Sequence, residues 1–240
     1  MTELSQRFDV TEETIRRDLE RLELEGLITR THGGAVLKVE NMFDRLGYTH
    51  RSRTNVEEKK KIAQIVASII PMQATLFADA SSTVMEALTL MADRDDITVL
   101  TNSIPVLSSL NQSGLNIMST GGANNRVSCS LQGIIARTTI MNYHVDFVLT
   151  SCKGLKLDEG AYDSREGETE IKQLMISRGQ KTIMMADHTK FDRTSFVKYC
   201  SFQQIDILVT DRRPADEWME LLEEYQIRIL YPEAEDAYIK

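Results

Sequence analysis

The feature that most constrains the fold is an alternation of short apolar runs with segments of helical periodicity, from about residue 57 to residue 230. The apolar runs span four or five residues, as strands do. Continuous apolar strands alternating with helices are typical of a parallel sheet covered by helices on both faces, so we predict a Rossmann-like α/β domain. The expected strands are residues 75–78, 97–101, 115–118, 145–149, 182–186, 205–209 and 227–230. The expected helices are residues 57–70, 84–91, 104–110, 131–140, 166–177 and 215–225.

A different pattern precedes this alternation and predicts two short helices. The first is expected at residues 3–7. Thr11 is a natural N-cap for the second, because its side-chain oxygen can accept a bond from a free backbone N–H of the first turn. Within that helix Ile15, Leu19 and Leu22 recur at helical spacing and form one buried stripe.

The residues after the second helix complete the outline of a winged helix-turn-helix. Gly26 stands where a helix C-cap belongs, and residues 27–31 are expected to form a strand. Gly33-Gly34 is typical of a tight hairpin turn. Helix, turn, helix and hairpin occur in that order in winged helix-turn-helix domains.

In such a domain the second helix enters the major groove of DNA, and Thr14, Arg16 and Arg17 fall near its leading end. Charge alone leaves an alternative open, which is an amphipathic surface helix with solvated arginines. The short loop before this helix and the glycine pair after it favour DNA binding. The predicted DNA-binding residues are Thr14, Arg16, Arg17, Arg21, Arg30 and His32.

The net charge of −8 is unevenly distributed along the 240 residues. Residues 1–60 carry 11 Lys and Arg against 12 Asp and Glu, so the acidity lies mostly in the second part. A local arginine face can therefore still bind phosphate. Three widely spaced cysteines form no zinc pattern, and no apolar run reaches membrane-spanning length. We expect a cytoplasmic location, no membrane partner, and no metal or cofactor.

Polar residues gather where several expected strands end, and open parallel sheets bind ligands at those ends. Asp79 and the hydroxyls of residues 81–83 follow the first strand, where hydroxyls beside a helix N-terminus make a phosphate cradle. The alternatives are helix capping by Ser82 or Thr83, plain turn chemistry at the other clusters, and an i,i+4 surface pair between Glu168 and Lys172. The predicted ligand-binding residues are Asp79, Ser81, Ser82, Thr83, Thr101, Asn102, Gly121, Gly122, Lys172, Asp187, His188 and Lys190.

Two sets of motifs carry a family resemblance. The first comprises Thr14-Ile15-Arg16-Arg17-Asp18-Leu19, Glu25-Gly26-Leu27 and Arg30-Thr31-His32-Gly33-Gly34-Ala35. The second extends through most of residues 58–211 and comprises Asp79, Ser82-Thr83, Thr101-Asn102-Ser103, Gly121-Gly122, Gly160, Glu168, Lys172 and Asp187-His188-Thr189-Lys190-Phe191. Both sets closely resemble the DeoR family of bacterial transcription regulators.

The resemblance implies a phosphorylated sugar or sugar-derived metabolite as effector, usually repression of a catabolic operon, and an effector domain similar in fold to ribose-phosphate isomerase. Family members usually have one more helix before the segment that corresponds to residues 4–8, so we expect the first helix to be missing from this winged helix. Lys153 stands where the family often has a small apolar residue, and it is a candidate for altering effector choice. We expect an incomplete DNA-binding domain at 1–37, a linker at 38–56 and an effector domain at 57–240.

Two functions compete. Asp79, Asp187 and Lys172 supply the residue types that a sugar-phosphate isomerase needs for proton transfer and oxyanion stabilisation. A recognition helix has no use in such an enzyme, however. We therefore predict a non-enzymatic repressor that binds operator DNA as a homodimer or homotetramer and is released by a phosphosugar.

Overall fold

The computed structural model describes residues 2–24, 28–31, 34–37 and 47–232, and it divides the chain into two compact units at Leu46 and Gly47. Each unit has its own core. Within the described residues, no helix has both the length and the apolar composition needed to cross a membrane. The expected C-cap at Gly26, the residue Gly33 of the expected turn, and His32 lie outside the described residues.

The first unit has the predicted order of elements. Helices α1 (Thr2–Phe8) and α2 (Glu12–Leu24) are followed by strands β1 (Ile28–Thr31) and β2 (Gly34–Leu37), which pair antiparallel. The Thr11 hydroxyl accepts a bond from the Thr14 amide at 3.2 Å, which is the expected N-cap contact. The expected stripe is buried, since Ile15 and Leu19 pack with Ile28, and Leu4 and Leu22 lie against them. The helix-turn-helix and its β-hairpin are therefore confirmed.

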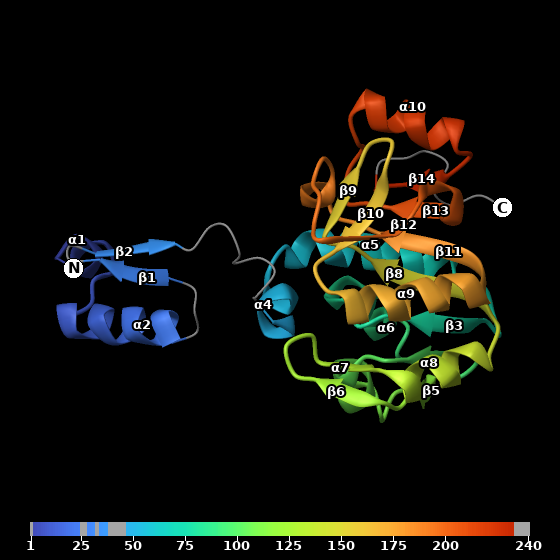
Figure 1. Cartoon of the computed structure of the whole chain (residues 1–240), viewed down its shortest axis with the longest axis horizontal. Coiled ribbons are helices and arrows are strands. Elements are labelled where there is room, and N and C mark those ends of the chain that lie inside the picture. The colour runs from blue at the N-terminus through green and yellow to red at the C-terminus, as the bar shows by residue number, and fades with distance from the viewer. Residues whose placement is uncertain (1, 25–27, 32–33, 38–46, 233–240) are drawn as a thin grey trace. The chain divides into compact units, whose positions relative to one another are not determined.

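The second unit is built on a seven-stranded sheet in the order β14-β13-β11-β8-β3-β4-β5 (Figure 1). Every neighbouring pair in it is parallel, as predicted. All seven expected strands belong to this sheet. They are β3 (Thr75–Ala78), β4 (Thr98–Thr101), β5 (Asn116–Ser119), β8 (Val145–Ser151), β11 (Gly179–Met185), β13 (Ile207–Val209) and β14 (Arg228–Leu230).

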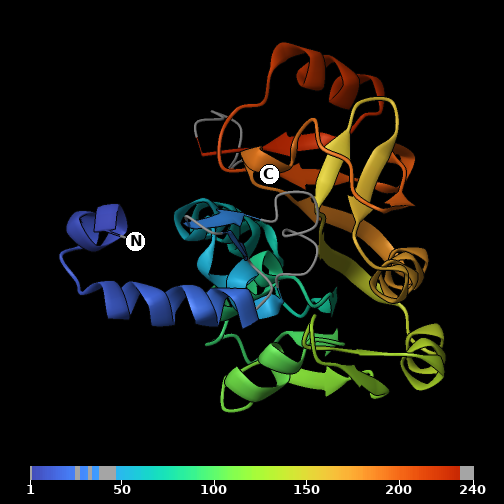
Figure 2. The same cartoon turned by 60° about the vertical axis from the view of Figure 1, so that its left-hand side comes forward.

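Helices cover both faces of this sheet. Alternate residues of each strand point to opposite faces, so each strand contributes to the apolar cluster on either side. Leu76 and Ala78 join one apolar cluster with α5 (Val56–Ile69), α6 (Ser82–Leu90) and α7 (Ile104–Ser109). Phe77 joins the other cluster with α8 (Ile134–Met141), α9 (Glu166–Arg178) and α10 (Asp216–Glu224). Figure 2 shows the yellow-green α8 beside the orange α9, which it contacts.

Several short elements were not predicted. Helix α4 (Tyr48–Arg53) lies within the expected linker and belongs to the second compact unit. A hairpin of β6 (Ala123–Asn125) and β7 (Ser130–Gln132) precedes α8, so the helix expected from residue 131 begins only at Ile134. Strands β9 (Gly154–Lys156), β10 (Gly160–Asp163) and β12 (Val197–Cys200) form a small antiparallel sheet. Two short 3₁₀ turns, η1 (His188–Lys190) and η2 (Phe202–Gln204), follow strands.

Candidate functional site

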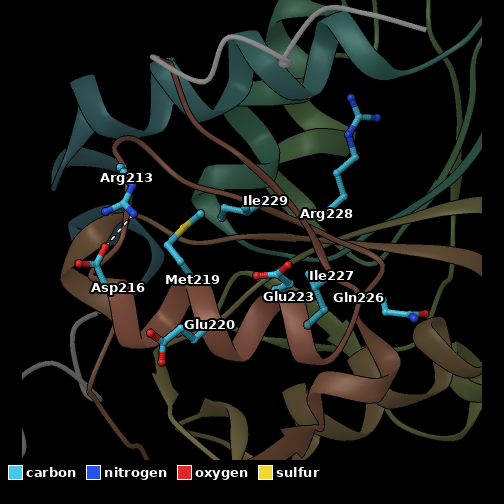
Figure 3. A pocket seen from close by; sticks show the side chains of 9 residues that line it. All are labelled: Arg213, Asp216, Met219, Glu220, Glu223, Gln226, Ile227, Arg228 and Ile229. Atoms are coloured by element: carbon cyan, nitrogen blue, oxygen red, sulfur yellow. Dashed lines mark ion pairs between the residues drawn. The ribbon is translucent and has the colours of Figure 1, made fainter.

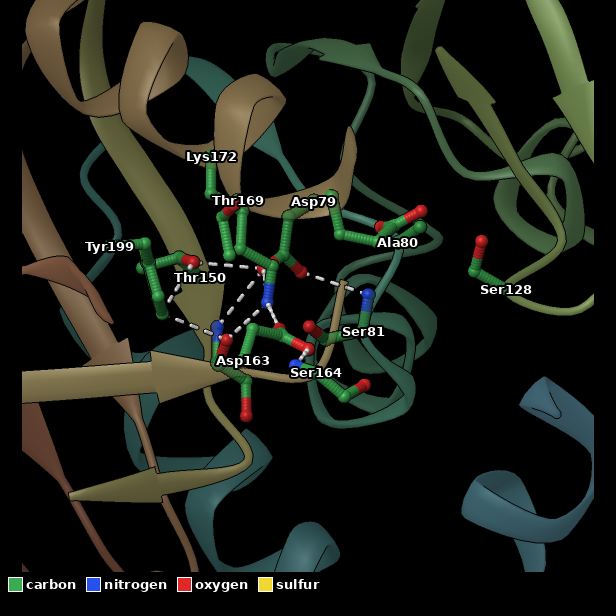
Figure 4. Close-up of polar contacts among 12 residues, drawn as sticks. Asp79, Ala80, Ser81, Ser128, Thr150, Asp163, Ser164, Thr169, Lys172 and Tyr199 are labelled. Carbon is green, nitrogen blue, oxygen red and sulfur yellow. Dashed lines mark hydrogen bonds and ion pairs between the residues drawn. The ribbon is translucent and has the colours of Figure 1, made fainter. Parts of the chain in front are cut away.

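The polar cluster at the carboxyl ends of β3 and β8 centres on Asp79, which is 1% exposed (Figure 4). Its Oδ1 accepts a bond from the Ser81 amide at 2.8 Å. Its Oδ2 accepts bonds from the Thr150 hydroxyl at 2.8 Å and the Ser151 amide at 3.1 Å. Because these donors come from two neighbouring strand ends, the carboxylate joins the two loops and is held in one orientation.

Lys172 of α9 lies against this carboxylate. Its Nζ is 3.1 Å from Asp79 Oδ2 and 2.6 Å from Asp163 Oδ2, and it also donates to the Ser151 carbonyl. Burial alone would lower the pKa of Lys172, but the carboxylates of Asp163 and Asp79 raise it well above its usual value. Burial would likewise raise the pKa of Asp163, and the Lys172 charge instead holds it below its usual value. The three groups therefore form a buried cluster of one cation and two anions.

The surface ion pair between Glu168 and Lys172, which was the alternative for this helix, does not form. Both side chains are buried, and Glu168 accepts bonds from Ser130 and Gln132 of β7 instead. Glu168 thereby fixes the β6–β7 hairpin to the first turn of α9.

The hydroxyl residues after Asp79 lie at the start of α6. Ser81 occupies the N-cap position but its side chain makes no capping bond, and Ser82 and Thr83 are buried within the first turn. The helix therefore begins two residues earlier than its apolar periodicity predicts. Neither Ser82 nor Thr83 occupies the N-cap position that the capping alternative required. The backbone N–H groups of this turn are the potential anion-binding groups of the loop.

Thr101 is the last residue of β4, Asn102 follows it, and both side chains bond to neighbouring backbone. The Thr101 hydroxyl donates to the Ala78 carbonyl at 2.7 Å, and Asn102 Nδ2 donates to the Leu131 carbonyl at 3.2 Å. Asn102 Oδ1 is buried and has no hydrogen-bond partner among the described residues.

The glycine pair after β5 accommodates the protein's own backbone. Gly121 and Gly122 have φ values of +65° and +112°, which other residues rarely adopt. A Cβ on Gly122 would lie 2.4 Å from the Gln132 carbonyl oxygen. At Gly122 the close approach to the backbone is therefore made by strand β7 of the same chain.

A further cluster of polar side chains follows strand β11. Asp187 Oδ1 accepts bonds from the Thr189 amide at 3.0 Å and from Asn55 Nδ2 at 3.1 Å, and Lys190 Nζ is 3.9 Å from Asp187 Oδ2. His188 bonds instead to Asp211, with Nδ1 2.8 Å from the carboxylate.

The ends of β3, β8 and β11 lie side by side, because β8 pairs in parallel with both of its neighbours. The polar groups after β3 and β11 therefore lie on either side of the end of β8. Cys152 directly follows β8, and burial raises the pKa of its thiol to about 12.

Five residues of this region were missed from the sequence, namely Asn55, Thr150, Ser151, Asp163 and Tyr199. Thr150 and Ser151 end β8, so an expected strand two residues longer would have included them. Asp163 ends β10, whose short and mixed sequence shows no strand pattern. Tyr199 donates to the Ser151 carbonyl at 3.0 Å, a contact that nothing in its local sequence indicates.

The exposed face of α2 carries four of the predicted DNA-binding residues: Thr14, Arg16, Arg17 and Arg21. Arg16 and Arg17 both pair with Glu13, at 3.2 Å and 3.5 Å, and all three side chains are more than half exposed. Arg30 lies in β1, where only its backbone is described.

A hollow lies apart from these polar clusters, at the β14 edge of the sheet (Figure 3). It has a volume of about 590 Å³ and is lined by residues 213–229 of α10, β14 and the segments beside them. An exposed ion pair between Arg213 and Asp216, 2.7 Å apart, lies at one end. None of the predicted site residues lines it.

A winged helix-turn-helix joined to an α/β unit with a polar strand-end cluster defines a two-domain, DNA-binding transcription regulator. Residues 1–41 match the DeoR-like helix-turn-helix domain, and residues 54–212 match the DeoR C terminal sensor domain. The chain belongs to the DeoR family of transcriptional regulators, which places it among regulators rather than enzymes.

Its relatives are similar over nearly their whole length. The uncharacterized HTH-type transcriptional regulator YulB of Bacillus subtilis is 36% identical over 95% of this chain and 88% of YulB. The HTH-type transcriptional repressor GlcR of the same organism is 34% identical over 96% and 88%. The glycerol-3-phosphate regulon repressor of Escherichia coli is 28% identical over 95% and 90%. Among solved structures, ribose 5-phosphate isomerase A from Methanocaldococcus jannaschii matches 57% of this chain and 55% of its own, with 10% identity and a TM-score of 0.44.

Proposed function

We propose that this regulator is a cytoplasmic repressor of a carbohydrate-catabolism operon and that a phosphorylated sugar or related metabolite releases it from its operator. Two relatives support the repressor assignment, since GlcR is a transcriptional repressor and the Escherichia coli relative represses the glycerol-3-phosphate regulon. The observation that carries the effector proposal is the buried, fully oriented Asp79 directly before the N-terminus of α6.

The donors at the start of α6 and the carboxylates of the site suit different parts of the ligand. A dianionic phosphate favours the N-terminal turn of α6, where backbone N–H groups and the hydroxyls of Ser82 and Thr83 are donors. Carboxylates repel phosphate and accept sugar hydroxyls. The proposed effector-binding residues remain Asp79, Ser81, Ser82, Thr83, Thr101, Asn102, Gly121, Gly122, Lys172, Asp187, His188 and Lys190. Because Lys172 is already paired with two carboxylates, we assign it to holding Asp79 in place rather than to direct phosphate contact.

The ligand proposal is tested by melting the full chain with a panel of phosphosugars, including ribose 5-phosphate and glycerol 3-phosphate, beside the unphosphorylated sugars. A ligand at about a hundred times its dissociation constant should stabilise the second unit by about 2.7 kcal/mol, which raises its melting temperature by several degrees. Only phosphorylated compounds should do so. Turnover of any of them would instead favour an isomerase, and the absence of any shift would contradict the effector proposal.

A matched pair of variants locates the phosphate. Thr83→Val removes a hydroxyl from the first turn of α6 and should weaken binding of the active phosphosugar by about 1.5–3 kcal/mol, the range for hydrogen bonds to charged groups. Thr89→Val makes the same change at the exposed far end of the helix and should leave binding unchanged. Equal affinities of the two variants would remove Thr83 from the site.

We also propose that the regulator assembles as a homodimer or homotetramer through its second unit. Winged helices usually bind two half-sites as dimers, and the first unit is too small and charged to supply a stable interface. Sedimentation at micromolar concentration should give at least a dimer. A truncated chain that starts at Gly47 should keep that assembly, and a monomeric full chain would contradict the proposal.

A further inference from the structure

The segment from Gly47 to Asn55, which we call the α4 junction, connects the two units in sequence. Only residues 38–46 separate its start from the end of β2. It precedes almost all of the matched sensor domain, which starts at residue 54, yet it belongs to the second compact unit. The covalent connection from the second unit to the winged helix runs through this segment.

Asn55 ties the α4 junction to the β11 cluster. It is the N-cap residue of α5, with φ of 51°, but its side chain makes no capping bond to its own helix. Its Nδ2 donates instead to Asp187 Oδ1 and to the Thr189 hydroxyl, both at 3.1 Å. An asparagine at an N-cap ordinarily accepts a bond from the first turn of its own helix. Here the side chain bonds instead to the loop after β11.

Lys59 and Arg51 tie the junction at two further points. Lys59 of α5 is 5% exposed and donates to the carbonyls of Arg51 and Thr54, at the C-terminus of α4. Burial lowers the pKa of Lys59 to about 8, and the charge of Lys190 adds to that effect. Arg51 Nη2 lies 3.5 Å from the carbonyl of Ala80, in the loop between Asp79 and α6.

The start of the junction contacts the β6–β7 hairpin. The Tyr48 amide donates to the Val127 carbonyl at 2.9 Å, and a Cβ on Gly47 would lie 2.8 Å from the same oxygen. The junction therefore contacts three of the loops that surround the proposed effector site, namely those after β3 and β11 and the loop of the hairpin.

We propose that the α4 junction is the element through which effector occupancy controls DNA affinity, with Asn55 as its principal contact. The proposal rests on the effector site proposed above. Asp187 Oδ1 already accepts bonds from Asn55 and from the Thr189 amide and hydroxyl. A ligand hydroxyl that donates to this carboxylate competes with Asn55, and loss of that bond frees the N-terminus of α5 and the helix before it. The ligand shifts the equilibrium because it favours the state in which Asn55 is released.

The proposal predicts that breaking the Asn55 contact weakens DNA binding without any ligand. Asn55→Gly keeps the left-handed backbone accessible and costs no capping bond, since the side chain makes none. Asn55→Asp adds a carboxylate beside that of Asp187. We expect affinity for a duplex selected by the wild-type full chain to fall about fivefold or more in both variants, as for a typical coupling between sites.

Thr75→Val is the matched control. It breaks the 2.6 Å bond from Thr75 to Asp146, at the amino ends of β3 and β8 and so at the opposite end of these strands. It should leave duplex affinity within about twofold of wild type despite some loss of stability. Hydrogen exchange on each full-length variant reports whether α4 is loosened; we expect faster exchange in both Asn55 variants and not in the control.

The proposal is overturned if the Asn55 variants exchange faster in α4 but bind the duplex as tightly as the control. It is equally overturned if α4 exchange does not change, since Asn55 would then not hold the junction. Neither measurement uses a ligand. A phosphosugar panel without any melting shift would therefore refute the effector site separately from this coupling.

Discussion

Replacing Lys172 with methionine is expected to lower the free energy of unfolding of the second unit by about 3–5 kcal/mol, the usual cost of removing one partner from a buried ion pair. Methionine fills the space of the stem but leaves Asp79 and Asp163 buried without their cation. Urea unfolding can be followed by the fluorescence of Trp218, the single tryptophan of the chain, which is buried in the same unit.

Two further variants identify the cause of that loss. Lys181→Met makes the same change at an exposed position and should alter stability by no more than about 0.5 kcal/mol. Adding Asp163→Asn to Lys172→Met should recover part of the loss, because Asp163 Oδ2 depends on Lys172, whereas Asp79 keeps bonds from Ser81, Thr150 and Ser151. If Lys172→Met were as stable as Lys181→Met, the cluster would contribute nothing and Lys172 would be available to a ligand phosphate.

Lys172 also shows how far periodicity can predict a site. Ile171 and Met175 recur at helical spacing, which places Lys172 beside the buried stripe of α9. In the structure Lys172 is buried as well, and its Nζ lies against Asp79 and Asp163. Its partners could not be predicted, because Asp79 and Asp163 come from the ends of two strands that are distant in sequence and lie in different sheets.

Strands β3, β4 and β13 could be predicted because burial on both faces makes them largely apolar, whereas the edge strand β5 is mostly exposed. The same rule misses short elements that are only partly buried. Residues 123–125 of β6 are Ala-Asn-Asn, and helix α4 carries His50, Arg51 and Arg53 with no apolar stripe. Their positions depend on contacts with distant loops. The sequence analysis accordingly predicted no helix or strand in the α4 junction and assigned its residues to the linker.

The partner of a closely approached glycine cannot be predicted from the sequence. The pair Gly121-Gly122 indicates that something approaches the backbone closely, but a sequence cannot say whether this is a ligand or the protein itself. At Gly122 it is the Gln132 carbonyl of the neighbouring hairpin.

In the first unit, Arg17→Ala is expected to weaken binding of the specific operator by about 1–3 kcal/mol if the guanidinium contacts a base. Arg17 is 78% exposed and lies 3.5 Å from Glu13, at the leading end of α2. An exposed pair of this kind contributes at most about 1 kcal/mol, so the guanidinium can exchange Glu13 for a base edge or a phosphate at little cost. Affinity should be measured at fixed salt on the selected duplex and on a scrambled one.

Arg213→Ala is the matched control, since Arg213 forms a comparable exposed pair with Asp216 in the second unit. It should leave affinity for both duplexes unchanged. If Arg17 reads a base, its loss should reduce the preference for the selected duplex. If it binds phosphate, both affinities should fall together and the slope of affinity against salt should decrease by about one. Equal binding by the Arg17 and Arg213 variants would remove Arg17 from the interface and move the search to Arg16, which shares Glu13 with it.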